Sequence, residues 1–462
     1  MAEQTTGPQA RPTGRRVTVL GCGYLGATHA VCMAELGHEV LGMDVDEEKI
    51  TRLAAGDVPF YEPGLPELLR THVASGRLRF TTSYGEVARF TADDPAGGVH
   101  FLCVGTPQKK GEYAADLRHV DTVFTELARH LTGPATLVGK STVPAGTAAR
   151  LAETVAALSP AGDAVEIVWN PEFLREGFAV TDTLHPDRLV FGLRDTTRAG
   201  GPGETALRDV YAPLLAAGTP LVVTDFATAE LVKVAANSFL ATKISFINAM
   251  AEVCEVTGAD VTQLSKALSY DTRIGGKFLN AGLGFGGGCL PKDIRAFMAR
   301  AGELGVDQAL SFLQAVDAIN MRRRARMVDL AREELGGSFG GTRVAVLGAA
   351  FKPDSDDIRD SPALDVALAM QKQGAAVCVY DPQAMDNARK AYPTLGYRDN
   401  TQEAVRGADI VLHLTEWQEF RDMDPTELGQ LVAARRIVDG RNVLDPHRWR
   451  TAGWTYRALG RP

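Results

Sequence analysis

The sequence predicts an α/β protein in which two Rossmann-like doubly wound domains are joined by a long central helix and a helical middle region. Three observations predict this fold. Short apolar runs alternate with helix-length segments near both ends of the 462 residues. A GxGxxG motif follows the first apolar run directly. Residues 225–257 then pass through 33 positions without Gly or Pro, which is the pattern of one long helix.

The apolar runs near the N-terminus are short and continuous, as in parallel strands covered on both faces. They predict strands at residues 16–20, 39–43, 99–104, 136–140, 165–169, 189–192 and 221–224. The segments between them are long enough for crossover helices. A doubly wound sheet is therefore expected over roughly the first 210 residues.

The long helix of the middle region is expected to begin after Asp225 as N-cap and to stop at Gly258. Helical patterns continue to about residue 335, and a glycine-rich linker follows. Further strands are expected at 343–347, 376–380, 410–414 and 436–438. The predicted organisation is a flexible tail at 1–15, a nucleotide-binding domain at 16–210, a helical region at 211–335 and a second Rossmann-like domain at 336–462.

The composition of the chain argues against several classes of binding partner. The formal net charge of −8 provides no bulk basic field for nucleic acid or an anionic membrane. The nearest candidate for a membrane span, residues 227–251, carries charged and amide side chains. None of the six cysteines forms a CxxC pair, so no structural metal site is expected. A cytoplasmic protein is the simplest interpretation.

The GxGxxG motif has the context that dinucleotide binding requires. Gly21 allows the tight turn, Gly23 lets the backbone approach a pyrophosphate, and Gly26 permits close packing of helix on strand. Asp44 ends the next predicted strand, where it would accept from a ribose hydroxyl and repel a 2′-phosphate. NAD is therefore expected rather than NADP. The second α/β half opens with VAVLGAAFKPD and keeps only Gly348, so a different nucleotide or no ligand is expected there.

A second candidate site is the loop GFGGGCLPKD around Cys289. Its glycines would leave backbone N–H groups free to turn towards a substrate oxygen. Lys292 could favour the thiolate, and Asp293 could hold a water or accept a proton. The alternative is a buried structural cysteine beside an exposed Lys–Asp pair.

Other candidates follow predicted strands or lie on the long helix. Lys233 and Asn237 are four residues apart on one helix face, which suits stabilisation of an oxyanion. They could instead be a solvated lysine and a packing asparagine. Glu172 or Glu176 could act as a general base or as a capping carboxylate. Thr142 could contact a ligand or cap the next helix.

Taken together, the motifs resemble a known family. They are GCGYLG, YEPGL, VGTP, STVPAGT, NPEFLREG, ELVKVAANSF, YDTRIG, GFGGGCLPKD, AAFKPDSDDIRDSP and DGRNVLDP. In this order, from Val17 to about Pro446, the chain resembles the UDP-glucose/GDP-mannose dehydrogenases. The resemblance implies an N-terminal NAD-binding domain, a central dimerising helical region and a C-terminal nucleotide-sugar domain, in a homodimer or higher homo-oligomer.

The resemblance also implies a reaction, the oxidation of a sugar-nucleotide alcohol to a carboxylate in two NAD-dependent steps. It implies Cys289 as the nucleophile, Lys233 and Asn237 as stabilisers of the reacting oxygen, and Asp293 as the group that handles a proton or water. Glu172 is similar to the base in thioester hydrolysis, assisted by Thr142. The implied cofactor contacts are Gly21, Gly23, Tyr24, Leu25, Gly26, Asp44, Lys49, Val104, Gly105, Thr106, Thr142, Glu176 and Arg359. The implied substrate contacts are Glu172, Phe173, Leu174, Lys233, Asn237, Arg273, Phe278, Gly286, Lys352 and Arg441.

Within the family, YDTRIG and the GGGC loop most resemble the enzymes that act on UDP-glucose, which is the expected substrate. Gly288 stands where Ser is usual and Leu290 where an aromatic is frequent, whereas Asn280 replaces a Lys of some animal members. Three alternatives stay open. They are another sugar nucleotide such as GDP-mannose or a UDP-N-acetylhexosamine, a single-step β-hydroxyacid dehydrogenase, and a nucleotide-binding module without activity.

Overall fold

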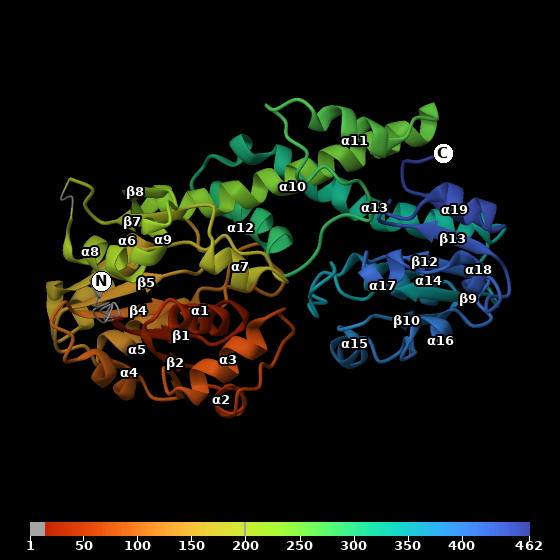
Figure 1. The fold of residues 1–462 in the computed structure, drawn as a ribbon. Coiled ribbons are helices and arrows are strands. Elements are labelled where there is room, and N and C mark those ends of the chain that lie inside the picture. Colours follow the sequence, from red (N-terminus) through yellow and green to blue (C-terminus); the bar gives the residue numbers. More distant parts are fainter. Residues whose placement is uncertain (1–13, 198–199) are drawn as a thin grey trace, which may run out of the picture. The chain divides into compact units, whose positions relative to one another are not determined.

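The computed structural model describes residues 14–197 and 200–462, which divide into two compact units (Figure 1). Of the described residues, the N-terminal unit comprises 14–107, 115–197 and 200–233, and the second unit comprises 108–114 and 234–462. The predicted flexible tail spans residues 1–15, and residues 1–13 of it lie outside the described residues. The division into three domains that the sequence predicts stays a prediction.

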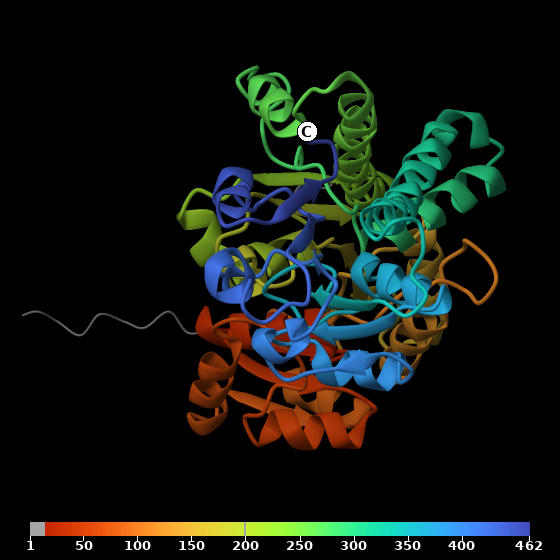
Figure 2. The same cartoon turned by 90° about the vertical axis from the view of Figure 1, so that its right-hand side faces the viewer.

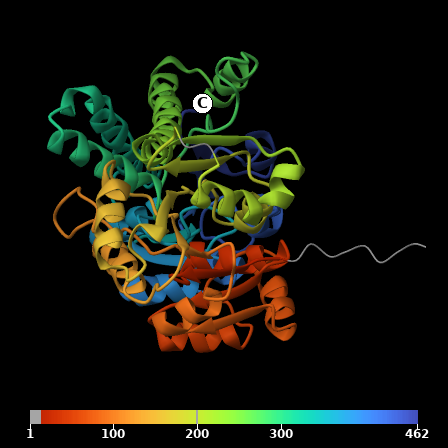
Figure 3. The same cartoon turned by 90° about the vertical axis from the view of Figure 1, so that its left-hand side faces the viewer.

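An eight-stranded sheet forms the centre of the N-terminal unit, in the order β3-β2-β1-β4-β5-β6-β7-β8. Strands β1 to β6 run parallel, whereas β7 pairs with β6 in antiparallel fashion and β8 is parallel to β7. Figure 3 shows this unit from its left-hand side. The strands are β1 (Arg16–Leu20), β2 (Glu39–Met43), β3 (Leu78–Thr81), β4 (Gly98–Leu102), β5 (Ala135–Gly139), β6 (Val165–Trp169), β7 (Leu189–Leu193) and β8 (Leu221–Asp225).

Helices cover both faces of this sheet, because successive strand residues point to opposite sides. Val17 and Val19 belong to a core cluster with residues of α1, α3, α8 and α9, whereas Leu20 and Leu102 belong to a second cluster with α4, α5 and α6. The helices of this unit are α1 (Tyr24–Glu35), α2 (Glu47–Ala54), α3 (Leu65–Ala74), α4 (Tyr84–Thr91), α5 (Arg118–Ala128), α6 (Thr147–Leu158), α7 (Ala179–Leu184), α8 (Pro202–Val210) and α9 (Ala212–Ala216).

The long helix α10 (Phe226–Thr257) begins in the N-terminal unit and continues in the second. Its ends confirm the prediction from the sequence. The Asp225 carboxylate accepts from the backbone N–H of Thr228 at 2.8 Å as the N-cap. Gly258 ends the helix with a φ of +75°, a conformation that favours glycine. It is followed by α11 (Val261–Ser269), α12 (Leu290–Glu303) and α13 (Phe312–Glu334).

The second unit contains a parallel six-stranded sheet in the order β11-β10-β9-β12-β13-β14, drawn in blue in Figure 2. The predicted glycine linker lies between α13 and β9. The strands are β9 (Arg343–Leu347), β10 (Ala376–Tyr380), β11 (Gly396–Tyr397), β12 (Ile410–His413), β13 (Arg436–Asp439) and β14 (Thr455–Ala458). The helices are α14 (Pro362–Lys372), α15 (Met385–Ala391), α16 (Thr401–Val405), α17 (Gln418–Arg421), α18 (Pro425–Leu428) and α19 (Pro446–Thr451).

All eleven predicted strands are present, with ends that differ by at most two residues. Three further strands were not predicted, namely β3, β11 and β14. Each lies at an edge of its sheet. An edge strand is less fully covered than a central one and lacks the continuous apolar run of a buried strand. The first sheet also extends past residue 210, since β8 pairs with β7 along its length.

Candidate active site

The loop between β1 and α1 has the shape that a dinucleotide requires. A Cβ on Gly26 would lie 1.9 Å from the Gly21 carbonyl oxygen, so only glycine lets the helix approach the strand this closely. At Gly23, by contrast, a Cβ would meet no heavy atom within 4 Å. The loop therefore leaves open space beside Gly23 at the N-terminal end of α1, where the helix dipole favours a phosphate. These residues fit the pyrophosphate of NAD.

Asp44 follows β2 and is almost fully buried. Its carboxylate accepts from the backbone N–H of Asp46 at 3.1 Å and from the Lys49 ammonium at 3.0 Å. The predicted contact of Asp44 with a ribose hydroxyl and that of Lys49 with the cofactor stay predictions. The ion pair explains why Asp44 and Lys49 occur together, since a cation beside a poorly solvated carboxylate offsets part of the cost of burying it.

The predicted cofactor residues after β4 and β5 are tied to one another. The Thr106 hydroxyl donates to the Thr142 carbonyl at 2.9 Å, and the Ser141 hydroxyl donates to the Val104 carbonyl at 2.7 Å. Adjacent parallel strands end at the same edge of the sheet, which brings these loops together. Val104, Gly105, Thr106 and Thr142 thus lie in one neighbourhood, and their contacts with the cofactor stay a prediction.

Glu172 and Lys233 form a buried ion pair in the N-terminal unit, with 3.0 Å between carboxylate and ammonium. The other carboxylate oxygen of Glu172 accepts from the Leu174 backbone N–H at 2.8 Å. Lys233 is therefore not a solvated lysine. The Phe173 ring lies 5.6 Å from the Lys233 ammonium and 3.8 Å from the Arg188 guanidinium. The segment NPEFLREG and helix α10 thus bring together a base, a cation and an aromatic ring.

The cap of α6 is not Thr142. Glu230, one turn before Lys233 on α10, accepts from the backbone N–H groups of Gly146 and Ala148, both at 2.7 Å. The capping role that the sequence left open for Thr142 therefore belongs to Glu230 at this helix.

In the second unit, Cys289 stands directly before α12, and it is exposed, whereas the other five cysteines are buried or half-buried. The alternative of a buried structural cysteine is therefore wrong. A thiol at the N-terminus of a 14-residue helix is in the position where the helix dipole favours the thiolate.

Polar side chains close to Cys289 in the fold form a chain of contacts. The Asn237 side-chain amide donates to one oxygen of the Asp293 carboxylate at 2.6 Å, and the Lys292 ammonium lies 2.5 Å from the other. Asn237 and Asp293 are both buried. Asn237 is thus more than a packing residue, because it orients a carboxylate one helical turn after the thiol. Lys292 thus contacts Asp293, and its expected effect on the thiol stays a prediction.

The glycines before Cys289 differ from the expectation. The Gly287 N–H donates to the Arg359 carbonyl at 2.8 Å, and the Gly288 N–H donates to the Asp357 carboxylate at 3.3 Å. These two amides are thus occupied within the unit and are not free for a substrate oxygen. A Cβ on Gly286 would lie 2.3 Å from the Asp360 carbonyl oxygen. Close packing on residues 351–360 therefore accounts for this part of the glycine run.

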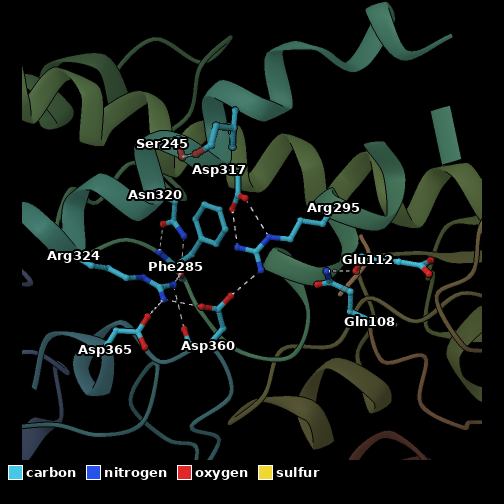
Figure 4. A network of polar contacts seen from close by, with 11 residues as sticks. Gln108, Glu112, Ser245, Phe285, Arg295, Asp317, Asn320, Arg324, Asp360 and Asp365 are labelled. Carbon is cyan, nitrogen blue, oxygen red and sulfur yellow. Dashed lines mark hydrogen bonds and ion pairs between the residues drawn. The ribbon is translucent and has the colours of Figure 1, made fainter. Parts of the chain in front are cut away.

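A polar network holds the start of this loop (Figure 4). Asn320 on α13 accepts from the Phe285 N–H at 2.8 Å and donates to its carbonyl at 2.9 Å. The Arg324 guanidinium contacts the same carbonyl at 3.3 Å and the Asp360 carboxylate at 2.7 Å. Arg295 on α12 pairs with Asp317 and Asp360. Helices α12 and α13 therefore fix the loop that ends in Cys289.

The predicted substrate residues of the second unit have different surroundings. The Arg441 guanidinium donates to the carbonyls of Leu414, Gly284 and Phe351 at 2.6 to 3.1 Å, so it also holds the unit together. Lys352 lies over the Phe351 ring, and Phe278 has a φ of +63°. Arg273 is highly exposed and pairs with Asp271. Arg359, a predicted cofactor contact, forms a bidentate pair with Asp357.

Sequence analysis missed several buried polar residues. Glu62 and Glu230 accept backbone N–H groups distant in sequence. The Lys140 ammonium lies 3.0 Å from the Asn170 side-chain oxygen, and burial lowers the pKa of Lys140 to about 8. The only signal was that Glu62 and Glu230 lie in quoted motifs and Lys140 lies beside one. Within the described part of the chain, no helix has an apolar stretch of the length that a membrane span needs.

Comparison with known proteins agrees with this geometry. The chain matches the models of the UDP-glucose/GDP-mannose dehydrogenase family for the NAD binding domain at residues 15–215, the central domain at 227–322 and the UDP binding domain at 345–446. It is 40% identical to UDP-glucose 6-dehydrogenase of Rhizobium meliloti over 447 residues, which is 97% of this chain and 100% of that protein.

Solved structures give the same result. A UDP-glucose dehydrogenase from the archaeon Pyrobaculum islandicum has a TM-score of 0.88 and 37% identity, covering 99% of this chain and 100% of that one. A UDP-D-ManNAc dehydrogenase from Pyrococcus horikoshii has a TM-score of 0.83 and 25% identity, covering 96% and 99%. Three consecutive family models and full-length similarity lead to one conclusion: the chain belongs to the UDP-glucose/GDP-mannose dehydrogenase family.

Proposed function

We propose that the chain catalyses NAD-dependent oxidation of the C6 alcohol of UDP-glucose to the carboxylate of UDP-glucuronate. The observation that carries this proposal is Cys289, an exposed thiol at the start of α12 beside the Asn237–Asp293 pair. A single alcohol-to-ketone oxidation needs no thiol, whereas oxidation to a carboxylate needs a group that retains the aldehyde. Similarity to UDP-glucose 6-dehydrogenases over nearly the whole chain supports this substrate.

NAD, when bound, accepts one hydride from C6 in each of the two oxidations. The residues proposed to hold it are those of the 21–26 loop, Asp44 with Lys49, the loops at 104–106 and 142, Glu176 and Arg359. The open space beside Gly23 and the buried Asp44 carboxylate fit this cofactor. Because Asp44 would repel a 2′-phosphate, NAD is favoured over NADP.

In the proposed reaction, Lys233 and Asn237 stabilise negative charge on the C6 oxygen. After the first oxidation, the Cys289 thiolate adds to the aldehyde carbon, and the oxygen takes up a proton to give a thiohemiacetal. Loss of the second hydride from carbon and of the hydroxyl proton leaves a thioester. Water then attacks the thioester carbonyl, the carbon–sulfur bond breaks, and the thiolate is regenerated. In total, one alcohol, one water and two NAD⁺ give one carboxylate, two NADH and three protons.

The base for hydrolysis is proposed to be Glu172, with Thr142 helping to position the water. The Glu172 carboxylate is held by the Lys233 ammonium through their 3.0 Å contact. Asp293 is proposed to accept the proton of the thiol or of an attacking water, in an orientation that Asn237 maintains. Cationic Lys352, Arg273 and Arg441 are proposed to bind the anionic diphosphate, for which the net charge of −8 provides no general attraction.

We also propose a homodimer, with a second copy of the chain covering one face of α10. Phe239, Phe246, Val253 and Val256 are exposed on this helix, at 67%, 49%, 53% and 88%. Their spacing of seven and three residues places them along one stripe, which is larger and more apolar than a helix normally leaves in water. The high exposure of Arg273 is consistent with a contact across this interface.

The proposed compartment is the cytoplasm, in agreement with five cysteines that stay buried or half-buried thiols.

The decisive experiment measures NADH formed per sugar nucleotide consumed, across UDP-glucose, GDP-mannose and UDP-N-acetylhexosamines. Two NADH per UDP-glucose, with the highest kcat/KM for that sugar, is expected. One NADH per sugar in the wild-type protein would contradict the proposal. Cys289→Ser should abolish complete turnover, whereas the matched Cys378→Ser, at a half-buried cysteine of β10, should keep it. Full activity in Cys289→Ala would indicate a single-step dehydrogenase instead.

A further inference from the structure

Glu62 lies in the motif YEPGL, which has no role in the proposed reaction, and its side chain is 2% exposed. One carboxylate oxygen accepts from the Gly177 backbone N–H and the other from the Ala179 backbone N–H, both at 2.7 Å. The first oxygen also accepts from the Tyr24 hydroxyl. A buried carboxylate is costly unless its oxygens are satisfied, and here three donors from two distant segments satisfy them.

The two segments, one at Tyr24 and the other at residues 177–179, both adjoin residues of the proposed site. Tyr24 is the first residue of α1 and directly follows Gly23 of the cofactor loop. Gly177 lies near the end of the segment 171–178, which carries Glu172 and Glu176, and Ala179 follows it directly as the first residue of α7. The Gly177 N–H also donates to the Tyr24 hydroxyl at 3.0 Å. Burial and the Glu62 carboxylate raise the pKa of the Tyr24 phenol, so Tyr24 remains a hydrogen-bond donor at neutral pH.

The contacts form a closed triangle of one carboxylate, one phenol and one backbone amide. Such a network in a poorly solvated environment transmits a displacement of one member to the others, because each bond depends on the geometry of its neighbours. The Tyr24 ring is also packed, since its centroid lies 4.9 Å from that of Phe60. Movement of the cofactor loop at Tyr24 therefore changes the hydrogen bonding of residues 177–179.

We propose that Glu62 is a positioning residue that couples occupation of the cofactor loop to the order of the segment 171–178. A dinucleotide at Gly23 and Tyr24 stabilises the Tyr24–Glu62 contact, and this contact holds the Gly177 and Ala179 amides. By thermodynamic reciprocity, an ordered 171–178 segment favours dinucleotide binding by the same factor. The inference rests on the proposed function only for the roles of Glu172 and Glu176.

The same unit contains an internal comparison. Glu230 also accepts two backbone N–H groups at 2.7 Å, those of Gly146 and Ala148. Glu230 belongs to α10, whereas Glu62 is the carboxylate that Tyr24 of the cofactor loop contacts. Removal of the Tyr24 hydroxyl should therefore affect the amides at 177–179 and leave those at 146–148 unchanged.

The test is hydrogen–deuterium exchange of the intact protein with and without NADH, in the wild type and in Tyr24→Phe. NADH should slow exchange at Gly177 and Ala179 in the wild type. In Tyr24→Phe at saturating NADH this protection should fall about tenfold, which corresponds to about 1.4 kcal/mol, as for a lost hydrogen bond to a charged group. Tyr397→Phe is the matched control, because Tyr397 donates to two carbonyls in the second unit, and its protection pattern should equal that of the wild type.

Equal NADH-dependent protection in wild type and Tyr24→Phe would overturn the proposal, and so would a wild type in which NADH leaves these amides unaffected. Glu62→Gln provides a second variant, in which the same loss of protection is expected. Because exchange needs no turnover, this test is independent of the NADH stoichiometry. A wrong assignment of the reaction would leave the exchange result intact, whereas an absent coupling would leave the two-NADH stoichiometry intact.

Discussion

In each of the two sheets a central strand, β1 or β9, is followed by a loop that begins with glycine, but the aspartate after the neighbouring strand makes different contacts in the two units. In the N-terminal unit, the Asp44 carboxylate after β2 contacts Asp46 and Lys49, which follow it in sequence. In the second unit, Asp381 after β10 accepts from the backbone N–H groups of Ala349 and Ala350 at 2.8 and 2.9 Å and from the Trp417 indole at 3.0 Å. Asp44 thus leaves the loop 21–26 available for a ligand, whereas Asp381 occupies the amides of Ala349 and Ala350.

This difference has a consequence for ligand binding. The amides of a β–turn–α loop are the groups that bind a pyrophosphate in a dinucleotide fold. At Ala349 and Ala350 these amides already bind an internal carboxylate, which is 1% exposed and carries the same sign of charge as a phosphate. The expectation that the second half binds no dinucleotide thus has a structural basis. The type of fold therefore does not decide by itself whether a dinucleotide binds. Binding also depends on whether an internal carboxylate already occupies the loop amides.

The largest effect should come from removing the internal carboxylate. Asp381→Ala leaves two backbone amides and an indole without their acceptor in a buried environment, and we expect a loss of about 3 kcal/mol in the free energy of unfolding. Urea denaturation measures this loss. Asp44→Ala is the matched change in the N-terminal unit and should cost less than 1 kcal/mol, because its partners reach solvent. Equal losses in the two variants would contradict the comparison.

Acid should weaken the N-terminal unit before the second unit. Burial lowers the pKa of His100 to about 3, and burial also lowers the pKa values of His29 and His38. In the unfolded chain these groups bind protons near pH 6.5, so stability is present above that pH and is lost as pH falls towards the folded pKa. His100 alone should cost about 2 kcal/mol at pH 5.

The second unit has a different buried histidine. His413 and Asp439 are paired at 2.9 Å. Burial acts to raise the pKa of Asp439, but the bonds from His413 and from backbone amides lower it overall. Its stabilisation is therefore present above the ordinary carboxyl pKa and is lost only below it. Pulsed hydrogen exchange between pH 7 and 4.5 should show opening of β1 and β4 first. Earlier opening of β12 and β13 would contradict this order.

A smaller effect is expected from filling the open space in the first loop. In Gly23→Ala the new Cβ meets no protein atom, so the melting temperature should stay within about two degrees of the wild type. The methyl group occupies space intended for the cofactor, and NAD affinity should fall about tenfold or more. Calorimetric titration with NADH measures the change. Ala350→Gly, the matched change in the second loop, should create no NADH binding.

The smallest expected effect concerns cofactor choice. Asp44→Asn removes the charge that opposes a 2′-phosphate while Lys49 stays in place. The ratio of kcat/KM for NADP to that for NAD should rise about tenfold, which corresponds to roughly 1.4 kcal/mol of repulsion. Asp46→Asn, at the exposed neighbour, is the control and should leave the ratio unchanged. An unaltered ratio in Asp44→Asn would mean that Asp44 does not face the ribose.

Much of the site could be predicted where a local pattern carries it. The loop 21–26, Asp44 and the ends of α10 all follow from short motifs and their context, whereas the motif around Cys289 left open whether this thiol is buried, and the structure shows it exposed. The sequence did not indicate that Gly287 and Gly288 donate to residues near 359, because that contact joins segments about 70 positions apart. Nor did it indicate the edge strands β3, β11 and β14, whose apolar pattern is weak.

By itself, then, the sequence determined the class of fold, the family and the cofactor loop, because strand and helix periodicity and glycine spacing are local properties of the chain. Only the tertiary structure decided which buried carboxylate meets which backbone amide. Glu62 reaches Gly177, Glu230 reaches Gly146, and Asp381 reaches Ala349. Each contact depends on the order of strands and the packing of helices between distant segments, and a buried charge is tolerated only where that packing supplies donors.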